Sequence, residues 1–263
     1  FFEQKILKLI KQTLHKFGFN SIFLIILSLF LILISSNEPG LWDDTMYHLP
    51  YAKDFAENNS EYPNFSLRYF FPLSGEILYS LSFLFKLNEY GAQLISLFPI
   101  FIASILLLNI SDQKKVNNFH KLIFIISFIA FDPIIEILGY AYIDYFLLLY
   151  CGLGSFIFFN SSTVYQKKYG LFFILFSASF KYMSLVFILL FTIFGNILNL
   201  KKIIFANMSF FFITILISFY WYFVNYYYVG NPFHPFFSNL FGFSYWTHED
   251  LLNLKTDVAR YHQ

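Results

Sequence analysis

Two carboxylates and an imidazole lie within six residues of each other in the segment Trp42-Asp43-Asp44-Thr45-Met46-Tyr47-His48. Tyr47 and His48 follow Asp44 at i+3 and i+4, so a helix starting here presents a carboxylate, a phenol and an imidazole on one face. A carboxylate near a low-dielectric boundary has a raised pKa, which suits a general base acting on a hydroxyl group. The structural alternative is that Asp43 caps an amphipathic helix over about residues 45–58 that lies on a membrane surface.

Three further ionisable residues interrupt apolar sequence later in the chain. Glu76 follows Pro72 and Gly75 at the start of a short apolar run, where it either complements the helix dipole or contacts a substrate. Asp144 begins another apolar run, and an ionisable group there indicates either a function or a hydrogen bond to a neighbouring helix. Lys181 interrupts a third run and needs an anion nearby, such as a lipid phosphate, unless it extends to the membrane surface.

Several common kinds of site have no support in the sequence. His48, His234 and His248 have no spacing diagnostic of zinc, and the single cysteine, Cys151, forms neither a disulfide nor a cysteine metal site within the chain. No Walker-type phosphate loop, dinucleotide fingerprint or nucleophile elbow is present. Nucleotide-driven transport and serine hydrolysis are therefore not expected.

The elements that must position these residues belong to a polytopic membrane protein. The chain has 263 residues, of which 58% are hydrophobic and 13% charged, and its mean hydropathy is +0.60. A net charge of +1 gives no reason to expect nucleic acid as a partner. Since a span needs ~20 residues, we expect spans at roughly 19–35, 91–110, 122–139, 143–159 and 203–225, with two short helices meeting at Lys181 over 171–199. The short run at 74–87 is expected to be interfacial or re-entrant.

Charge favours one topology for these spans. If 74–87 does not cross and 171–199 crosses twice, one side of the membrane collects eleven cations against two acids. These cations are Lys5, Lys8, Lys11, Lys16, Lys114, Lys115, Lys121, Lys167, Lys168, Lys201 and Lys202. The positive-inside rule makes that side cytoplasmic. It follows that residues 1–18 form a cytoplasmic amphipathic segment, while the loop 36–72 and the tail 227–263 are external.

Several separated segments together resemble the membrane-embedded C-class (GT-C) glycosyltransferases, the group that includes aminoarabinose and protein mannose transferases. The segment from Trp42 to Lys53 resembles the first external loop of that family, in which an aspartate is followed by Tyr-His-Leu-Pro. Ala141-Tyr142-Ile143-Asp144 is similar to a family Ala-Tyr-x-Asp, and Phe180-Lys181-Tyr182 to a Thr-Lys-Tyr-like turn. The segments Trp221–Asn225 and Gly230–Pro235 resemble Trp-x-x-Arg-Asn and Gly-Asn-Pro-x-Tyr-Pro, with Val224 in place of arginine and His234 in place of tyrosine.

The resemblance implies an all-α, polytopic helical bundle whose first external loop bears interfacial helices, in one transmembrane domain over 1–263. It implies inverting transfer of a sugar from a polyprenyl-phosphate donor to a hydroxyl of a lipid or glycan acceptor, sometimes with a divalent metal ion. Asp43 aligns with the essential acid, and Asp44 is kept as a second catalytic candidate. The implied substrate-binding residues are Tyr47, His48, Glu76, Asp144, Lys181, Asn225 and His234. Because Val224 replaces the arginine, Lys181 becomes the better candidate for holding the lipid phosphate.

Two other functions stay open at this stage. In a transporter or lipid flippase, Asp43, Asp144 and Lys181 would line a polar path through the bilayer. In a noncatalytic membrane scaffold they would serve the structure alone. The bias toward Phe, Ile, Asn and Lys suggests an AT-rich bacterial genome, so we expect a bacterial inner membrane with the site on the periplasmic face. Because the sequence starts at Phe1 rather than Met, we also expect a piece of a longer protein.

Overall fold

The computed structural model describes residues 18–36, 38–57, 70–194, 197–242, 247–250, 252–253 and 256. Within these residues the protein is all-helical and has no strand, which confirms the predicted all-α class. The predicted cytoplasmic segment 1–18 lies outside the described residues except for Gly18, as do residues 58–69 of the predicted external loop and much of the predicted tail.

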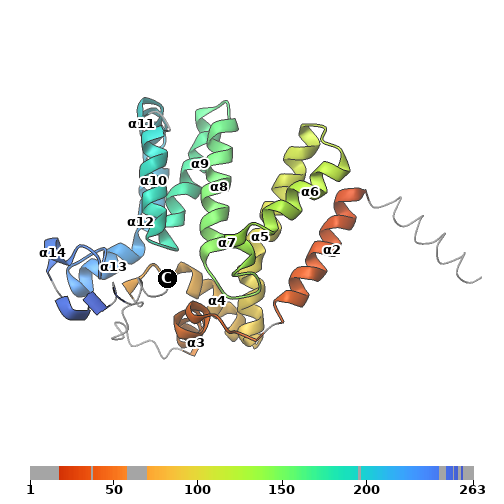
Figure 1. The fold of residues 1–263 in the computed structure, drawn as a ribbon. Coiled ribbons are helices and arrows are strands. Elements are labelled where there is room, and N and C mark those ends of the chain that lie inside the picture. The colour runs from red at the N-terminus through yellow and green to blue at the C-terminus, as the bar shows by residue number, and fades with distance from the viewer. Residues whose placement is uncertain are drawn as a thin grey trace, which may run out of the picture.

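The helices follow one another with short connections (Figure 1). Their bounds are α2 Phe19–Ile34, η1 Asp44–His48, α3 Leu49–Glu57, α4 Ser74–Leu84, α5 Asn88–Gln113, α6 Asn118–Ile129, α7 Asp132–Ile135, α8 Asp144–Asn160, α9 Val164–Phe176, η3 Ser177–Ser179, α10 Met183–Phe194, α11 Ile197–Phe205, α12 Met208–Ser218, α13 Tyr220–Val229 and α14 Ser238–Phe241. The helix α2 packs on α5, α5 on α4 and α8, and α9 on α8 and α12.

Local sequence explains where several helices begin and end. The Asn117 side chain accepts a hydrogen bond from the His120 N–H at 2.9 Å, and Thr163 caps α9 in the same way through the Gln166 N–H at 3.2 Å. At the end of α9, the Ser177 and Ser179 hydroxyls donate to backbone carbonyls three residues earlier, which competes with the helical pattern. The predicted pair of short helices meeting near Lys181 is therefore present, with α9 and η3 before the lysine and α10 after it.

Two predicted continuous runs are interrupted in the structure. The run at 122–139 is broken because Phe131 is extended and Pro133 follows at the start of α7, so α6 ends at Ile129. The run at 203–225 is divided into parts of α11, α12 and α13, and α12 and α13 meet at Phe219 with a bend of 54°. In both regions the helices are therefore shorter than the predicted spans.

Among the described helices, α5 is long and apolar enough to cross a membrane by itself, and α12 with α13 would provide another crossing if the bent pair is one span. The helices α2, α6, α8 and α10 are apolar but shorter. Large apolar side chains are exposed along the outer faces of α2, α6, α10 and α12. They include Ile25, Ile26, Leu29, Leu33, Ile123, Phe124, Ile126, Val186, Leu189, Ile193, Phe194, Phe212, Ile213 and Leu216.

The packed core beside the candidate site joins five parts of the chain. Its buried members come from α3, α4, α5, the loop before α8 together with the start of α8, and the turn before α10. They are Leu49, Ala52, Tyr79, Ala92, Ala141, Ile143, Phe146 and Phe180. In Figure 1 this region lies at the lower end, where α3 and α4 meet the lower ends of α5 and α8. The turn between α5 and α6, the turn between α8 and α9, and α11 lie at the upper end.

Candidate functional site

The predicted cluster at residues 43–48 is folded into the interior. Residues Asp44–His48 form a π-helical turn, and the side chains of Asp44 and His48 are both 0% exposed. Tyr47 is also buried, whereas Asp43, at the start of the turn, is half-buried. The Asp43 backbone is already helical and its side chain makes no capping hydrogen bond, so the capping explanation of this aspartate is wrong.

Asp44 is attached to a distant loop through one carboxylate oxygen. The Ala141 N–H donates to Asp44 Oδ1 at 3.2 Å, while Oδ2 is buried and has no hydrogen-bond partner among the described residues. Burial raises the pKa of the Asp44 carboxyl to about 6, although the Ala141 N–H and the nearby His48 act in the opposite direction. This carboxyl therefore changes its charge near neutral pH.

His48 and Glu76 form a buried pair. Nδ1 of His48 lies 2.6 Å from Oε1 of Glu76, and the two side chains are 0% and 1% exposed. The second nitrogen, Nε2, and the second oxygen, Oε2, have no partner among the residues that the structure describes. The start of α4, which carries Glu76, packs closely against Ile143 in the loop before α8. Gly75 allows this contact, because a Cβ there would collide with the Ile143 side chain.

Tyrosine rings surround the His48 imidazole. Its ring centroid lies 4.0 Å from that of Tyr47, 5.8 Å from that of Tyr142 and 6.4 Å from that of Tyr79. The carboxylates of Asp43, Asp44 and Asp144 all act electrostatically on the Tyr142 hydroxyl. Burial, followed by the charge of Asp43, raises the pKa of Tyr142 to about 12, so this phenol stays protonated at neutral pH.

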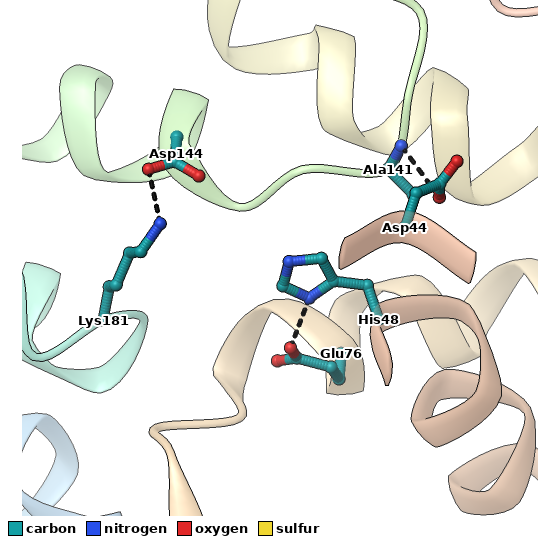
Figure 2. A network of polar contacts seen from close by, with 6 residues as sticks. All are labelled: Asp44, His48, Glu76, Ala141, Asp144 and Lys181. Atoms are coloured by element: carbon teal, nitrogen blue, oxygen red, sulfur yellow. Dashed lines mark hydrogen bonds and ion pairs between the residues drawn. The ribbon is translucent and has the colours of Figure 1, made fainter. Parts of the chain in front are cut away.

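Lys181 and Asp144 form a second ion pair at the same end of the molecule (Figure 2). Lys181 Nζ lies 2.7 Å from Asp144 Oδ1, and the two side chains are 31% and 35% exposed. The expected anion beside Lys181 is thus supplied by the chain itself. Asp144 also acts electrostatically on Tyr79 and Tyr142, together with Asp44, which places this pair close to the His48 cluster.

Asn225 and His234 belong to a neighbouring network that holds the chain together. The Asn225 side-chain amide donates to the Phe70 carbonyl at 2.6 Å and to the Tyr182 hydroxyl at 3.0 Å. The Tyr182 hydroxyl in turn donates to the carbonyls of Phe70 and His234. The predicted substrate-binding Asn225 is 1% exposed and therefore serves as a junction between α13, the turn before α10 and the segment before α4.

The His234 ring is buried against Phe70, with ring centroids 4.6 Å apart. It is 2% exposed, and neither ring nitrogen has a hydrogen-bond partner in the described part of the chain. Burial lowers the pKa of His234 to about 4, so the imidazole is neutral at physiological pH. The structure separates this histidine from the His48–Glu76 pair and places it in the Asn225 network.

Sequence reasoning assigned no role to two aromatic residues of the site, Tyr79 and Tyr142. Tyr142 stands within Ala141–Asp144, a segment that carries the family resemblance, and Tyr79 follows Glu76 by three residues. A signal was therefore present, but tyrosine is common in this chain and its position does not stand out. Among the described residues no group of three or more His, Cys, Asp and Glu side chains is arranged to hold a metal ion.

Comparison with known proteins finds a relative that matches about half of this chain. An uncharacterized protein of Shigella flexneri is 32% identical over 132 residues, which are 49% of this chain and 65% of the relative. A scan against known protein families finds no match. A search of solved structures likewise finds no match.

Proposed function

We propose that the chain crosses a membrane several times, with the lower end in Figure 1 facing the outside. Support comes from the large apolar side chains exposed on α2, α6, α10 and α12, because surfaces of this kind favour lipid contact. Further support comes from charge. The elements at the upper end carry Lys114 and Lys115, Lys167 and Lys168, and Lys201 and Lys202, as expected of a cytoplasmic side.

We propose that the protein is a glycosyltransferase that uses a polyprenyl-phosphate sugar at this outer end. The observation that carries the proposal is the gathering of acid, imidazole and cation in one place, on segments that connect apolar helices. The half-buried Asp43, the buried His48–Glu76 pair and the partly exposed Lys181–Asp144 pair come from four separate parts of the sequence. Ionisable groups at the edge of apolar helices are costly unless they serve a function or a structural pairing.

In the proposed reaction, Asp43 is the general base and Lys181 stabilises the leaving group. Asp43 accepts the proton of the acceptor hydroxyl, and that oxygen forms a bond to the anomeric carbon of the sugar. The bond from this carbon to the phosphate oxygen breaks on the opposite side, so the configuration inverts. The leaving lipid phosphate takes the electron pair, and Lys181 stabilises its charge.

Asp44 has a different role in this proposal. Its side chain is 0% exposed and holds the Ala141 N–H, so it fixes the loop that carries Tyr142 and leads to Asp144. Asp43 is half-buried and can meet an acceptor without unfolding the π-helical turn. We therefore assign proton transfer to Asp43 and positioning to Asp44.

The test is transfer of labelled sugar from a panel of polyprenyl-phosphate sugars by the purified full chain, compared with Asp43→Asn. Loss of a general base lowers the rate by about 10²–10⁴-fold. The matched control is Asp54→Asn, which changes an acid on α3 outside the cluster. We expect transfer by the parent and the control, and its loss in Asp43→Asn with the fold retained. Absence of transfer from every donor would contradict the proposal.

One observation favours transport as a second candidate function. Discontinuous helices form ion and substrate sites in many transporters, and this chain has a break between α9 and α10 next to Lys181 and a 54° bend between α12 and α13. In a transporter, Asp144→Asn abolishes flux of a labelled lipid or solute in vesicles while no sugar is transferred. Formation of a glycosylated product by the parent protein decides against this candidate.

A further inference from the structure

The His48–Glu76 pair has the geometry of an oriented histidine. One ring nitrogen is held by a carboxylate at 2.6 Å, which fixes the ring and leaves the other nitrogen for proton exchange. Both side chains are almost completely buried, and Nε2 of His48 has no hydrogen-bond partner among the described residues. Most buried side-chain polar atoms have a hydrogen-bond partner, so the unpartnered Nε2 calls for an explanation.

The polar atoms around this pair share the same property. In the described residues, Asp44 Oδ2, Glu76 Oε2 and the Tyr79 hydroxyl are also buried without a hydrogen-bond partner. An unsatisfied buried polar group destabilises a fold, so these three atoms and His48 Nε2 require a common explanation. A small hydrogen-bonding guest such as water satisfies such atoms and also conducts protons between them.

The His48–Glu76 pair lies between the π-helical turn and the cation that would hold the phosphate. In Figure 2, His48 lies between Asp44 on one side and the Lys181–Asp144 pair on the other, and its second nitrogen points away from Glu76 toward the side of Lys181. Asp44, which follows the proposed base Asp43 in the sequence, therefore stands on one side of the imidazole. The cation that would hold the leaving phosphate stands on the other side.

We propose that His48, oriented by Glu76, is a proton relay that connects the carboxylates of the π-helical turn with the phosphate side of the site. This inference rests on the proposed function and adds a residue to it. Through intervening water, His48 Nε2–H gives its proton to the phosphate oxygen as the bond from that oxygen to the sugar breaks. Nε2 then recovers a proton, again through water, from Asp43, which took it from the acceptor hydroxyl. No net proton is released, and Glu76 keeps its bond to Nδ1 throughout.

Since the relay depends on pH, the groups that face His48 matter. The turn itself contributes Asp44 and Tyr47, α4 contributes Glu76 and Tyr79, the loop before α8 contributes Tyr142, and α8 contributes Asp144. Of these, Glu76 holds Nδ1 at 2.6 Å and Asp44 interacts electrostatically with the ring. Because its side chain is 0% exposed, His48 acts through this water and is a positioning residue.

The first test compares His48→Gln with His120→Gln, which removes an exposed histidine at the opposite end of the molecule. We expect His48→Gln to lower kcat by about 10²-fold or more, to leave KM for the lipid-sugar donor within about threefold, and to remove one limb of the pH–rate profile. His120→Gln leaves all three unchanged. If the parent protein transfers sugar and His48→Gln keeps the parental profile, the relay is overturned while the transferase stands.

The second test does not depend on activity. In the full chain labelled with ¹⁵N-histidine, the signals of His48 are followed between pH 5 and 9 by NMR, beside the same chain carrying Glu76→Gln. A relay requires that the His48 ring gains and loses a proton, and that Glu76→Gln alters the ¹⁵N signals of its two ring nitrogens. A His48 that stays in one protonation state throughout overturns the relay, whether or not the protein proves to be a transferase.

Discussion

Asp44 and His48 are neighbours in sequence, yet their environments are set by residues far along the chain. Asp44 receives a hydrogen bond from Ala141, 97 positions later, and His48 pairs with Glu76, 28 positions later. Burial removes water from both side chains, so each must rely on these few partners. At the residue scale, the site is therefore as sensitive to its supporting loops as to the ionisable groups themselves.

The raised pKa of Asp44 predicts a loss of stability with rising pH. The folded protein keeps its proton up to about pH 6, whereas the unfolded chain releases it near the ordinary value of 3.8. Between these values the folded state holds more protons, so the stabilisation is complete below pH 4 and is lost as pH rises toward 6. Asp44→Asn removes this dependence. Thermal unfolding of both proteins in detergent across pH 4–7 measures it.

His234 predicts the opposite slope in an overlapping range. Its pKa of about 4 in the folded protein is lower than the ordinary value of 6.5, so the unfolded state takes up a proton first as pH falls. Stability from the neutral buried ring is complete above pH 6.5 and is lost as pH falls toward 4. His234→Phe removes this effect and keeps an aromatic ring on Phe70.

These two variants check each other in the same melting experiment. In the parent protein the two slopes oppose, so the Tm changes little between pH 4 and 6. Asp44→Asn should reveal a Tm that rises with pH, and His234→Phe a Tm that falls. A variant whose Tm follows the parental curve would show that the corresponding side chain is not buried as described.

The sequence could place part of the site but not its pairings. The spacing from Asp44 to His48 was enough to predict that they share a turn, and the topology predicted from charge grouped Glu76, Asp144 and Lys181, which lie at one end of the molecule. The ion pair between Asp144 and Lys181 could not be predicted, because it depends on how α8 and the break after α9 pack in three dimensions. For the same reason, the burial of Asn225 in a structural junction was missed.

At the scale of elements, the contact between α8 and α9 depends on two glycines. A Cβ on Gly154 would lie 2.6 Å from Ile174 Cγ1 and 2.7 Å from the Gly170 carbonyl oxygen, closer than ordinary contacts. Small residues allow helices to approach closely where apolar side chains gain nothing from leaving lipid. The start of α8 carries Asp144, so this contact also helps to hold one half of the ion pair with Lys181.

Gly154→Ala should therefore separate α8 from α9 and destabilise the protein by about 1–3 kcal/mol. The control is Gly152→Ala in the same helix, where an added Cβ meets nothing within 4 Å. Alanine favours a helix by about 1 kcal/mol over glycine, so the control should be neutral or slightly stabilising. Unfolding of the two variants in denaturant compares them directly, and equal stabilities would contradict the close packing.

The helix boundaries show which features the hydropathy pattern predicted and which it missed. Pro133 was a visible signal that α6 could not continue, but the length of the apolar run led to a single predicted span over 122–139. The bend at Phe219 has no proline or glycine nearby in the sequence, so it follows from packing rather than from a local breaker. Patterns in hydropathy therefore found the helices more reliably than they found the breaks within them.

At the scale of the whole molecule, the two ends differ in charge and chemistry. The lower end in Figure 1 is formed by α3, α4 and the start of α8, while the lysine-bearing turns lie at the upper end. If the protein spans a membrane as proposed, these ends face opposite compartments. A lipid donor suits the outer end, because it can enter from the bilayer beside the helices.

This orientation predicts the accessibility of introduced cysteines. In a Cys151→Ala background, Lys53→Cys on α3 should react with an impermeant maleimide applied to intact cells. Lys168→Cys on α9 should react only after the membrane is opened. Both positions are lysines in exposed or partly exposed helical sites, so they form a matched pair. Labelling of both from the same side would contradict the proposed topology.

Sugar transfer in reconstituted vesicles tests the central claim most directly. The full chain is supplied with a labelled polyprenyl-phosphate sugar and acceptor lipids, and the glycosylated product is counted per protein beside folded Asp43→Asn. The account predicts repeated turnover by the parent protein and a loss of about 10²-fold or more in the variant. Equal product from both proteins, or none from an intact parent with every donor, would contradict it.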